Sequence, residues 1–319
     1  MENVPAAGGL QDIIGESPAL KRALELVSKL ALSNAPVLIL GEAGSGKELI
    51  ARAVHRIGPR RNKSLVHVNC AATPAEMLSD ELFGHETGAS GDPDIKNISG
   101  LESANTEEVN SDEIAPLPLD YPPPPPREAT RPEFERLGRS LFRNKKGAEV
   151  NILKIGRLEQ ANMGTIFLDE IAPIPLNIQA KLLRLLEKRQ FERLGSLKSI
   201  PVNVRLIAST KYDLGERVAA KMFRGELYNE LNVSPIRMPP LRERREDIPL
   251  LALFFLQKFA RRMDKHIEGI PADTMNFLVE REWPGNVRQL QNLIERSVVL
   301  TDGSELQVPL EDFKREFET

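Results

Sequence analysis

The chain has 319 residues, of which 41% are hydrophobic and 28% are charged, as in ordinary globular proteins of about two domains. Its net charge of -3 argues against a general nucleic-acid-binding surface, its single cysteine excludes an internal disulfide, and its four histidines lack metal-ligand spacing. No apolar run approaches the ~18 residues of a membrane helix, and no leader pattern is present, so we expect a cytoplasmic protein without membrane contacts.

Short apolar runs alternate with segments of helical spacing over residues 1–240. This alternation is typical of an α/β domain, in which helices cover both faces of a parallel sheet. We therefore predict a five-stranded parallel sheet flanked by helices. Strands are predicted at residues 37–40, 65–68, 165–168, 205–208 and 233–236, and helices at residues 20–32, 48–57, 177–188 and 224–231.

The strand signals stop after Pro239-Pro240. Three segments of helical spacing follow at residues 247–265, 272–281 and 287–300, and they predict a small all-helical domain over residues 241–319. A short tail helix is predicted near residues 308–316, and it is too acidic and too brief to read a DNA groove. Any DNA contact would then belong to a domain outside this sequence.

The composition changes between about residues 90 and 146. Residues 101–120 carry six acidic and no basic side chains, and five consecutive prolines follow at 122–126. A proline run forms neither helix nor central strand, so a stiff polyproline II spacer is expected there. We predict an inserted, flexible surface segment with one transient helix, and the alternative is a dedicated ligand for a proline-recognising partner.

The predicted strand at 37–40 leads directly into Gly41-Glu42-Ala43-Gly44-Ser45-Gly46-Lys47-Glu48, which fits the pattern G-x-x-x-x-G-K of a phosphate-binding loop. The glycines let the backbone N–H groups point inward, Lys47 adds a positive charge at the phosphates, and a helix N-terminus faces the same anion. Glu48 stands where the general motif has a Ser or Thr that ligates Mg²⁺, so the metal shell must be completed differently. The alternative is an ordinary glycine turn. The predicted nucleotide-binding residues are Gly41, Glu42, Gly44, Ser45, Gly46, Lys47 and Glu48.

A second motif follows the predicted strand at 165–168, which ends in Asp169-Glu170. At the carboxyl end of a parallel strand beside a phosphate loop, Asp169 can hold Mg²⁺ and Glu170 can polarise an attacking water. The alternative is a strand followed by a solvated acidic turn. Together the two motifs predict a site that hydrolyses a nucleoside triphosphate, with ATP and Mg²⁺ as its ligands.

These motifs, in this order, resemble the central AAA+ ATPase domain of sigma-54-dependent transcriptional activators, the bacterial enhancer-binding proteins. The resemblance covers about residues 11–302, interrupted only by the insertion. It implies a P-loop AAA+ core with a helical lid, a homo-oligomeric ring for which a hexamer is one arrangement, and RNA polymerase with sigma-54 as the partner. The matching segments are residues 14–17, 41–48, 68–72, 81–86, 164–171, 191–195, 231–233, 239–249 and 283–288.

The resemblance also implies roles for single residues. Residues 13–15, with Ile14 at their centre, would lie near the adenine, and Arg288 would reach from the lid to the phosphates. Asn69 matches a polar residue that restrains Glu170 until the machine is engaged, and Arg224 matches an arginine inserted into the neighbouring subunit's site. For Trp283 we expect simple lid packing. The predicted catalytic residues are thus Glu170, Asn69 and Arg224, with Ile14 and Arg288 binding nucleotide and Asp169 binding Mg²⁺.

The chain departs from the family pattern at three places. Residues 90–146 replace the tip of the loop that contacts sigma-54, Glu230 stands where a second trans-acting arginine is expected, and Lys211 replaces the usual asparagine of the first sensor. An arginine finger is worth about 10³ to 10⁵ in rate, so Glu230 predicts slow turnover unless Arg242 or Arg244 substitutes. Lys211 is expected to pair with phosphate or with Glu170. The alternative function is therefore a nucleotide-binding regulatory module with little turnover, which does not engage sigma-54 and acts through its insertion.

Overall fold

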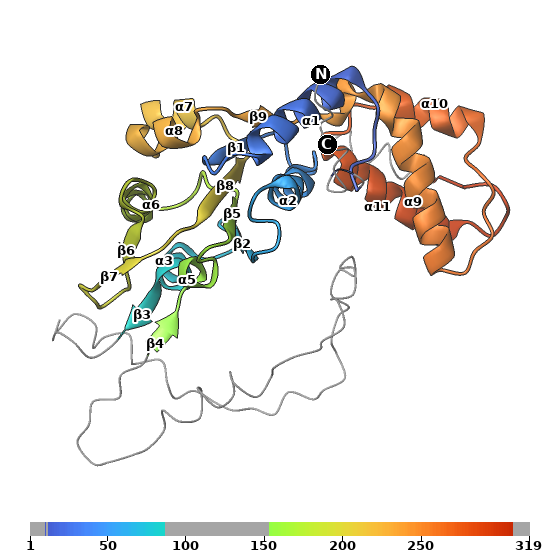
Figure 1. Ribbon diagram of the computed structural model, residues 1–319. Coiled ribbons are helices and arrows are strands. Elements are labelled where there is room, and N and C mark those ends of the chain that lie inside the picture. The colour runs from blue at the N-terminus through green and yellow to red at the C-terminus, as the bar shows by residue number, and fades with distance from the viewer. Residues whose placement is uncertain (1–9, 11, 87–152, 309–319) are drawn as a thin grey trace, which may run out of the picture. The chain divides into compact units, whose positions relative to one another are not determined.

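The computed structural model describes residues 10, 12–86 and 153–308, which are coloured in Figure 1. The chain divides into one unit of Met1–His85 and Leu153–Thr319 and a second unit of Glu86–Ile152, of which only Glu86 is described. The predicted insertion at 90–146 and the body of the predicted tail helix therefore lie outside the described residues. Among the residues that are described, none of the helices combines the length and apolar character that a membrane span requires.

A five-stranded parallel sheet, in the order β2-β5-β8-β1-β9, lies at the centre of the first unit, as the sequence predicts. The fifth strand was expected at residues 233–236 and instead forms at Ile236–Arg237, because Pro235 has no N–H to donate to the ladder. The strands are β1 (Val37–Leu40), β2 (Leu65–Asn69), β5 (Thr165–Asp169), β8 (Arg205–Thr210) and β9 (Ile236–Arg237).

Helices cover both faces of this sheet (Figure 1). Successive residues of a strand point to opposite faces, and accordingly Leu38 enters one hydrophobic cluster while Val37 and Ile39 enter the other. One face packs against α1 (Pro18–Ala31) and α2 (Lys47–Ile57). The other face packs against α3 (Ala75–Phe83), α5 (Arg157–Gln160), α6 (Leu176–Lys188), α7 (Leu214–Ala219) and α8 (Gly225–Leu231).

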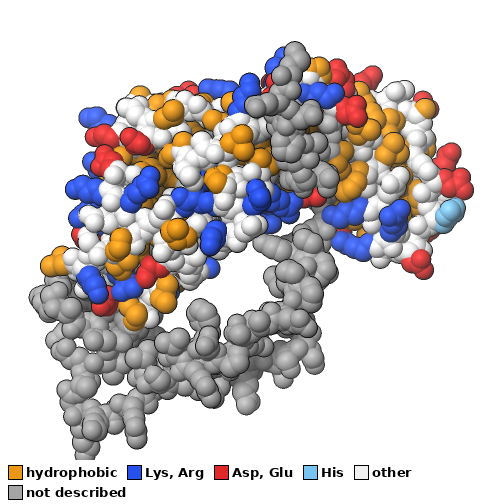
Figure 2. Space-filling view, in the orientation of Figure 1, with side chains coloured by type: hydrophobic (Ala, Val, Ile, Leu, Met, Phe, Trp, Pro, Cys, Tyr) orange, Lys and Arg blue, Asp and Glu red, His pale blue; other side chains and the backbone are white. Residues whose placement is uncertain are grey.

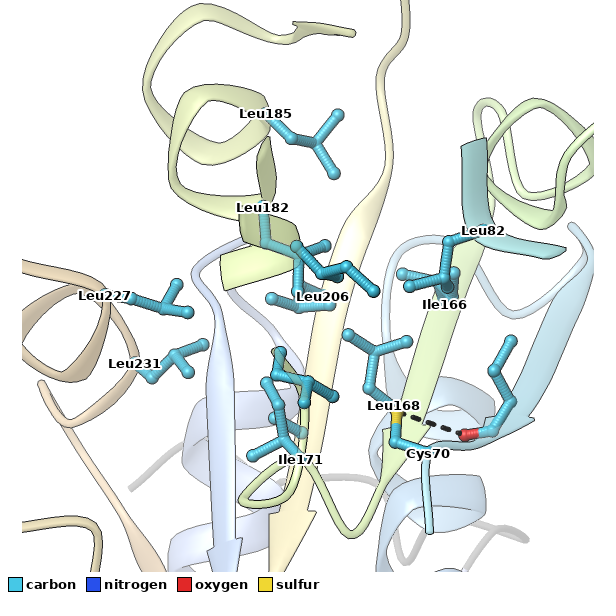
Figure 3. Close-up of a cluster of buried hydrophobic side chains, with 14 of the residues drawn as sticks. Cys70, Leu82, Ile166, Leu168, Ile171, Leu182, Leu185, Leu206, Leu227 and Leu231 are labelled. Atoms are coloured by element: carbon cyan, nitrogen blue, oxygen red, sulfur yellow. Dashed lines mark hydrogen bonds between the residues drawn. The ribbon is translucent and has the colours of Figure 1, made fainter. Parts of the chain in front are cut away.

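The single cysteine belongs to the second of these clusters. Figure 3 shows Cys70 among aliphatic side chains such as Leu168, Ile166 and Leu206. Burial, with a smaller contribution from neighbouring carboxylates, raises the pKa of the Cys70 thiol to about 12. The thiol is therefore protonated at neutral pH and serves as a small apolar core residue.

Two small two-stranded sheets and the helices α3, α5 and α7 were not predicted. One sheet joins β3 (Gly84–Glu86) to β4 (Leu153–Ile155), and the other is the antiparallel pair of β6 (Gln190–Glu192) and β7 (Ser199–Pro201). Strands of three residues are too short to show a periodic pattern in the sequence.

Three helices form a separate hydrophobic cluster after the sheet, as expected for a lid. Trp283 is 1% exposed within this cluster, and its Nε1 donates to the Leu278 carbonyl at 2.8 Å, which agrees with its expected packing role. Division of the protein into domains at residue 240 stays a prediction. The helices are α9 (Ile248–Arg262), α10 (Ala272–Glu280) and α11 (Asn286–Leu300), preceded by the short 3-10 turns η3 (Leu241–Glu243) and η4 (Arg245–Asp247).

The surface carries charges of both signs. On the face shown in Figure 2, Lys and Arg side chains are interspersed with acidic and apolar ones over the described residues. This mixture agrees with the net charge of -3 and with the absence of a general basic field in the composition.

Candidate functional site

The glycine-rich loop connects β1 to α2 at the carboxyl edge of the sheet. Gly44 (φ 73°) and Gly46 (φ 104°) adopt left-handed backbone conformations that side-chain-bearing residues rarely tolerate, and Gly46 is the N-cap of α2. The Ser45 hydroxyl is buried and has no hydrogen-bond partner among the described residues. Buried hydroxyls normally have a partner, so a glycine cradle with an unpaired hydroxyl at a helix N-terminus fits a phosphate group.

Lys47 is buried in this loop, with 7% of its side chain exposed. Its Nζ donates to the carbonyls of Gly41 at 2.8 Å and Glu42 at 3.1 Å, and it forms an ion pair with Glu170 Oε1 at 3.0 Å. The structure therefore brings together the two residues that the sequence predicts for phosphate binding and for water activation. In the free chain each neutralises the other.

Glu170 immediately follows β5 and has a left-handed backbone (φ 55°), which is strained for a residue with a side chain. Its second oxygen, Oε2, accepts the backbone N–H of Lys211 at 3.1 Å. Lys211 thus contacts Glu170 through its backbone amide, while its Nζ lies 5.1 Å from the centroid of the Tyr212 ring. Pairing of the Lys211 side chain with phosphate or with Glu170 stays a prediction. The hydrogen bond from the Lys211 amide thus orients the Glu170 carboxylate toward Lys47.

Asp169 ends β5 beside Glu170. Its Oδ1 accepts a short hydrogen bond from the Ser209 hydroxyl at the end of β8, and its Oδ2 lies 3.9 Å from Nε2 of His67. No group of three or more His, Cys, Asp or Glu side chains that could hold a metal occurs within the described ranges. The single carboxylate of Asp169, held by Ser209 at the end of its strand, is a type of ligand that Mg²⁺ takes, with water and phosphate oxygens completing the shell.

Asn69 lies next to Asp169 in the register of β2 and β5. Its Oδ1 accepts the backbone N–H groups of Ala71 and Ala72, both at 3.0 Å, and so caps the turn after β2. In the described residues no hydrogen bond joins Asn69 to Glu170. The restraint on Glu170 that the resemblance implies for Asn69 stays a prediction, and the partner that the Glu170 side chain has here is Lys47.

Ile14 and its neighbours are strapped to the start of the lid. Ile14 packs against the hydrophobic cluster of the lid, and Gly15 (φ 142°) has no room for a side chain, since a Cβ would lie 2.6 Å from Asp247 Oδ2. Asp247 is fully buried and accepts the N–H groups of Glu16 at 2.7 Å and Ser17 at 2.8 Å and the Ser17 hydroxyl at 2.7 Å. Asp247 was not predicted, because nothing near it in the sequence indicates its partners.

Replacement of Asp247 by alanine is expected to lower the free energy of unfolding by about 3 kcal/mol. Two buried donors of Ser17 and one partly buried donor of Glu16 would lose their acceptor, and an unsatisfied buried group costs about 1 to 3 kcal/mol. Urea unfolding followed by circular dichroism measures the change. Asp302→Ala, at an exposed aspartate, is the control. An effect of Asp247→Ala as small as that of the control would contradict this account.

The carboxylate of Glu42, predicted to bind nucleotide, is directed at the lid. Arg242 donates to both of its oxygens, at 2.6 and 2.9 Å, and Asn286 Nδ2 donates to Oε2 at 3.0 Å. The hydrogen bonds from Arg242 hold the pKa of Glu42 below its ordinary value, so it is ionised at neutral pH. Arg244 is buried and donates to the Ser45 carbonyl at 2.8 Å. Both arginines considered as substitutes for the missing trans-acting arginine therefore bind the P-loop of their own chain.

The predicted lid arginine, Arg288, and the predicted trans-acting arginine, Arg224, lie in different surroundings. Arg288 is exposed in the first turn of α11, and its Cβ lies 3.0 Å from the position of a Cβ built on Gly44, which places it at the P-loop. Arg224 precedes α8, where its N–H donates to Gln179 Oε1 at 2.8 Å and its Nε lies 3.9 Å from Glu226 Oε2. Among the described residues no hydrogen bond or ion pair joins Arg224 to the P-loop.

Comparison with known proteins identifies relatives over nearly the whole chain. The sequence matches the Sigma-54 interaction domain over residues 13–144 and 129–237, and the AAA+ ATPase lid domain over residues 242–319. The DNA-binding transcriptional activator HyfR of Escherichia coli K12 is 43% identical over 302 residues, which are 95% of this chain and 37% of HyfR. The formate hydrogenlyase transcriptional activator FhlA of the same organism is 43% identical over 312 residues, 98% of this chain and 37% of FhlA. The chain thus spans well under half the length of these relatives.

The fold also has counterparts among solved structures. NtrX from Brucella abortus, crystallised in complex with ATP, has a TM-score of 0.70 and 32% sequence identity, with coverage of 94% of this chain and 54% of NtrX. Its complex with ADP gives a TM-score of 0.69 at the same identity. These comparisons confirm the resemblance that the sequence motifs indicate. The chain belongs to the sigma-54 interaction domain family and is an AAA+ module of that family, complete with its helical lid.

Proposed function

We propose that this chain is the ATP-hydrolysing module of a sigma-54-dependent transcription regulator. In this proposal it binds ATP and Mg²⁺, assembles with copies of itself into a ring, and couples the state of the nucleotide to contacts with RNA polymerase that carries sigma-54. The observation that carries the proposal is the ion pair between Lys47 and Glu170 inside the glycine loop, beside Asp169. Support for the setting comes from HyfR and FhlA, which are transcriptional activators, and from NtrX, which was crystallised with ATP.

The residues present fit the roles that hydrolysis requires. Lys47 and the N–H groups of the loop would hold the phosphates, and Asp169, fixed by Ser209, would hold Mg²⁺. When bound, the metal neutralises charge that develops on the phosphate oxygens. Lys47 would exchange its carboxylate partner for phosphate oxygens, so Glu170 would be released only when substrate is present. The Lys211 amide on Oε2 would then keep that carboxylate in place as it accepts a proton from water.

A second candidate function is a nucleotide-binding regulatory module with little turnover, acting through its insertion. Two substitutions favour it. Glu230, exposed on α8, replaces a trans-acting arginine, and Lys211 replaces the asparagine of the first sensor. Both candidates share nucleotide binding and a cytoplasmic location, and in both a DNA contact would need a further domain. The two candidates differ in whether ATP is turned over and whether sigma-54 is engaged.

Nucleotide binding by the Lys47→Ala variant tests the part that both candidates share. A lysine that makes charged hydrogen bonds to phosphate contributes about 1.5 to 3 kcal/mol, so ATP is expected to bind about ten- to 100-fold more weakly. Titration with a fluorescent ATP analogue in the presence of Mg²⁺ measures the dissociation constant. Lys21→Ala, at an exposed lysine of α1, is the matched control.

Two further measurements decide between the candidates. Brisk ATP turnover, together with a larger mass in light scattering when ATP and Mg²⁺ are added, would support the first. Tight binding without turnover would support the second. If the unaltered chain binds no ATP, both are wrong.

A further inference from the structure

Four consecutive P-loop residues, 42–45, each bind the lid of the same chain. Glu42 accepts from Arg242 and Asn286, and the Ala43 carbonyl accepts from Asn286 Nδ2 at 3.0 Å. We call the lid residues that make these bonds the lid clamp, and they act on every position of this stretch. The lid clamp consists of Arg242, Arg244, Asn286 and Val287, of which Val287 donates its N–H to the Gly44 carbonyl at 3.1 Å and Arg244 donates to the Ser45 carbonyl at 2.8 Å.

These bonds determine how the peptide groups of the loop are oriented. The carbonyl of a trans peptide and the N–H of the next residue point in opposite directions. Bonds from the lid to the carbonyls of Ala43, Gly44 and Ser45 therefore turn the following N–H groups away from the lid. Those N–H groups are the ones that a phosphate loop uses to bind its anion.

The backbones of the P-loop and the lid are packed closely against each other. A Cβ on Gly44 would lie 2.2 Å from the Gly285 carbonyl oxygen, so the two backbones touch. Asn286 adopts a left-handed backbone (φ 53°), a conformation that asparagine tolerates better than most residues, and its Oδ1 accepts the Leu241 N–H at 2.7 Å. One side chain thus ties the start of α11, the start of the lid and the P-loop together.

Charge adds to this geometry. Arg242 makes a bidentate contact with Glu42, and the hydrogen bond with Glu42 raises the pKa of Arg242. A partly exposed ion pair contributes little when it stands alone. Here the carboxylate also accepts from Asn286, and its backbone belongs to the loop that Lys47 bonds, so loss of the pair disturbs a connected network.

We propose that Arg242 is a positioning residue that sets nucleotide affinity in its own subunit. Through Glu42 and Asn286 it holds the P-loop against the lid. Phosphate binding at the loop is therefore coupled to the orientation of the lid. The proposal rests on nucleotide binding, the first part of the proposed function. It also assigns Arg242 to its own chain's site and not to the place that Glu230 leaves without an arginine in a neighbouring subunit.

A double-mutant cycle on Glu42 and Arg242 tests this proposal. The single variants Glu42→Gln and Arg242→Gln are each expected to weaken binding of a fluorescent ADP analogue about fivefold or more. Because the two side chains act as one pair, the double variant is expected to bind no more weakly than the weaker single variant. Binding is measured on dilute protein, where contributions from a neighbouring subunit are smallest.

Arg245→Gln is the matched control, because it removes one charge and one ion pair from the same segment. Arg245 NH2 pairs with Glu282 Oε1 at 2.6 Å, wholly within the lid. Its expected effect on the dissociation constant is less than twofold. Thermal melting of each variant shows whether a loss of binding is only a loss of folded protein, and the charge swap Glu42→Arg with Arg242→Glu is expected to recover part of the affinity.

Several outcomes would overturn the inference while leaving the proposed function intact. The first is that the unaltered chain binds nucleotide and the Arg242→Gln variant binds it equally well. The second is additive effects in the double variant, which would mean that Arg242 does not act through Glu42. The third is a trans role: if mixing Arg242→Gln subunits with Lys47→Ala subunits restores turnover that neither has alone, Arg242 acts in the neighbouring site.

Discussion

The Glu170→Gln variant is expected to lose ATP turnover by a factor of about 10² to 10⁴ and to bind ATP more tightly than the unaltered chain. The loss follows because glutamine cannot accept a proton from water. The gain in binding follows because Lys47 forms its ion pair with Glu170 Oε1 in the free chain, and that pair must open before Lys47 can bind phosphate. A neutral side chain at position 170 removes this competition.

Steady-state turnover and the dissociation constant of a fluorescent ATP analogue measure the two effects separately. Glu187→Gln, at an exposed glutamate of α6, is the control and is expected to change neither. Retained turnover would exclude Glu170 as the base. Weaker binding would show that the ion pair with Lys47 does not compete with phosphate.

The Glu230→Arg variant is expected to raise the turnover of the assembled protein, by up to about 10³-fold, because an arginine finger contributes about 10³ to 10⁵ in rate. Glu230 is exposed near the end of α8, the helix that Arg224 immediately precedes. A charge reversal at this position acts on a neighbour's site only after assembly. The gain is therefore expected to depend on protein concentration.

Turnover measured over a range of protein concentrations tests this expectation. Asn229→Arg places the same charge on the adjacent exposed position and serves as the control. In the Glu230→Arg background, Arg224→Ala is expected to abolish the gain, because both arginines would then be required. A rate that stays low and unchanged in Glu230→Arg would mean that the missing arginine does not limit turnover, and it would favour the second candidate function.

The sequence alone predicted the sheet, the lid helices and the phosphate loop. Apolar runs such as residues 37–40 and 205–208 indicated buried parallel strands because both faces of such strands are covered. Lys47 and the Asp169-Glu170 pair were found because their chemistry needs a fixed order of residues within one short segment. The one displaced strand, at Ile236–Arg237, begins after Pro235 for a local reason that the sequence did contain.

Only the tertiary structure decided which partner each polar side chain takes. Glu42 lies inside the phosphate loop and was predicted to bind nucleotide, yet its carboxylate pairs with Arg242, 200 residues away. The phosphate loop brings the Nζ of Lys47 to 3.0 Å from Glu170, while Asn69 caps its own turn. Asp247 lies in a segment that matches the family pattern, but no role was predicted for it, since its partners, Glu16 and Ser17, are 231 and 230 residues away.

The division has a simple physical reason. Backbone conformation and burial depend on properties of neighbouring residues, so periodicity, glycines and prolines reveal them locally. A hydrogen bond or ion pair depends on two groups meeting at about 3 Å, and the sequence does not state which distant groups the fold will bring that close. The sequence of this protein therefore determined that a phosphate site exists, and the fold determined that Glu170 and the lid hold its lysine and its loop.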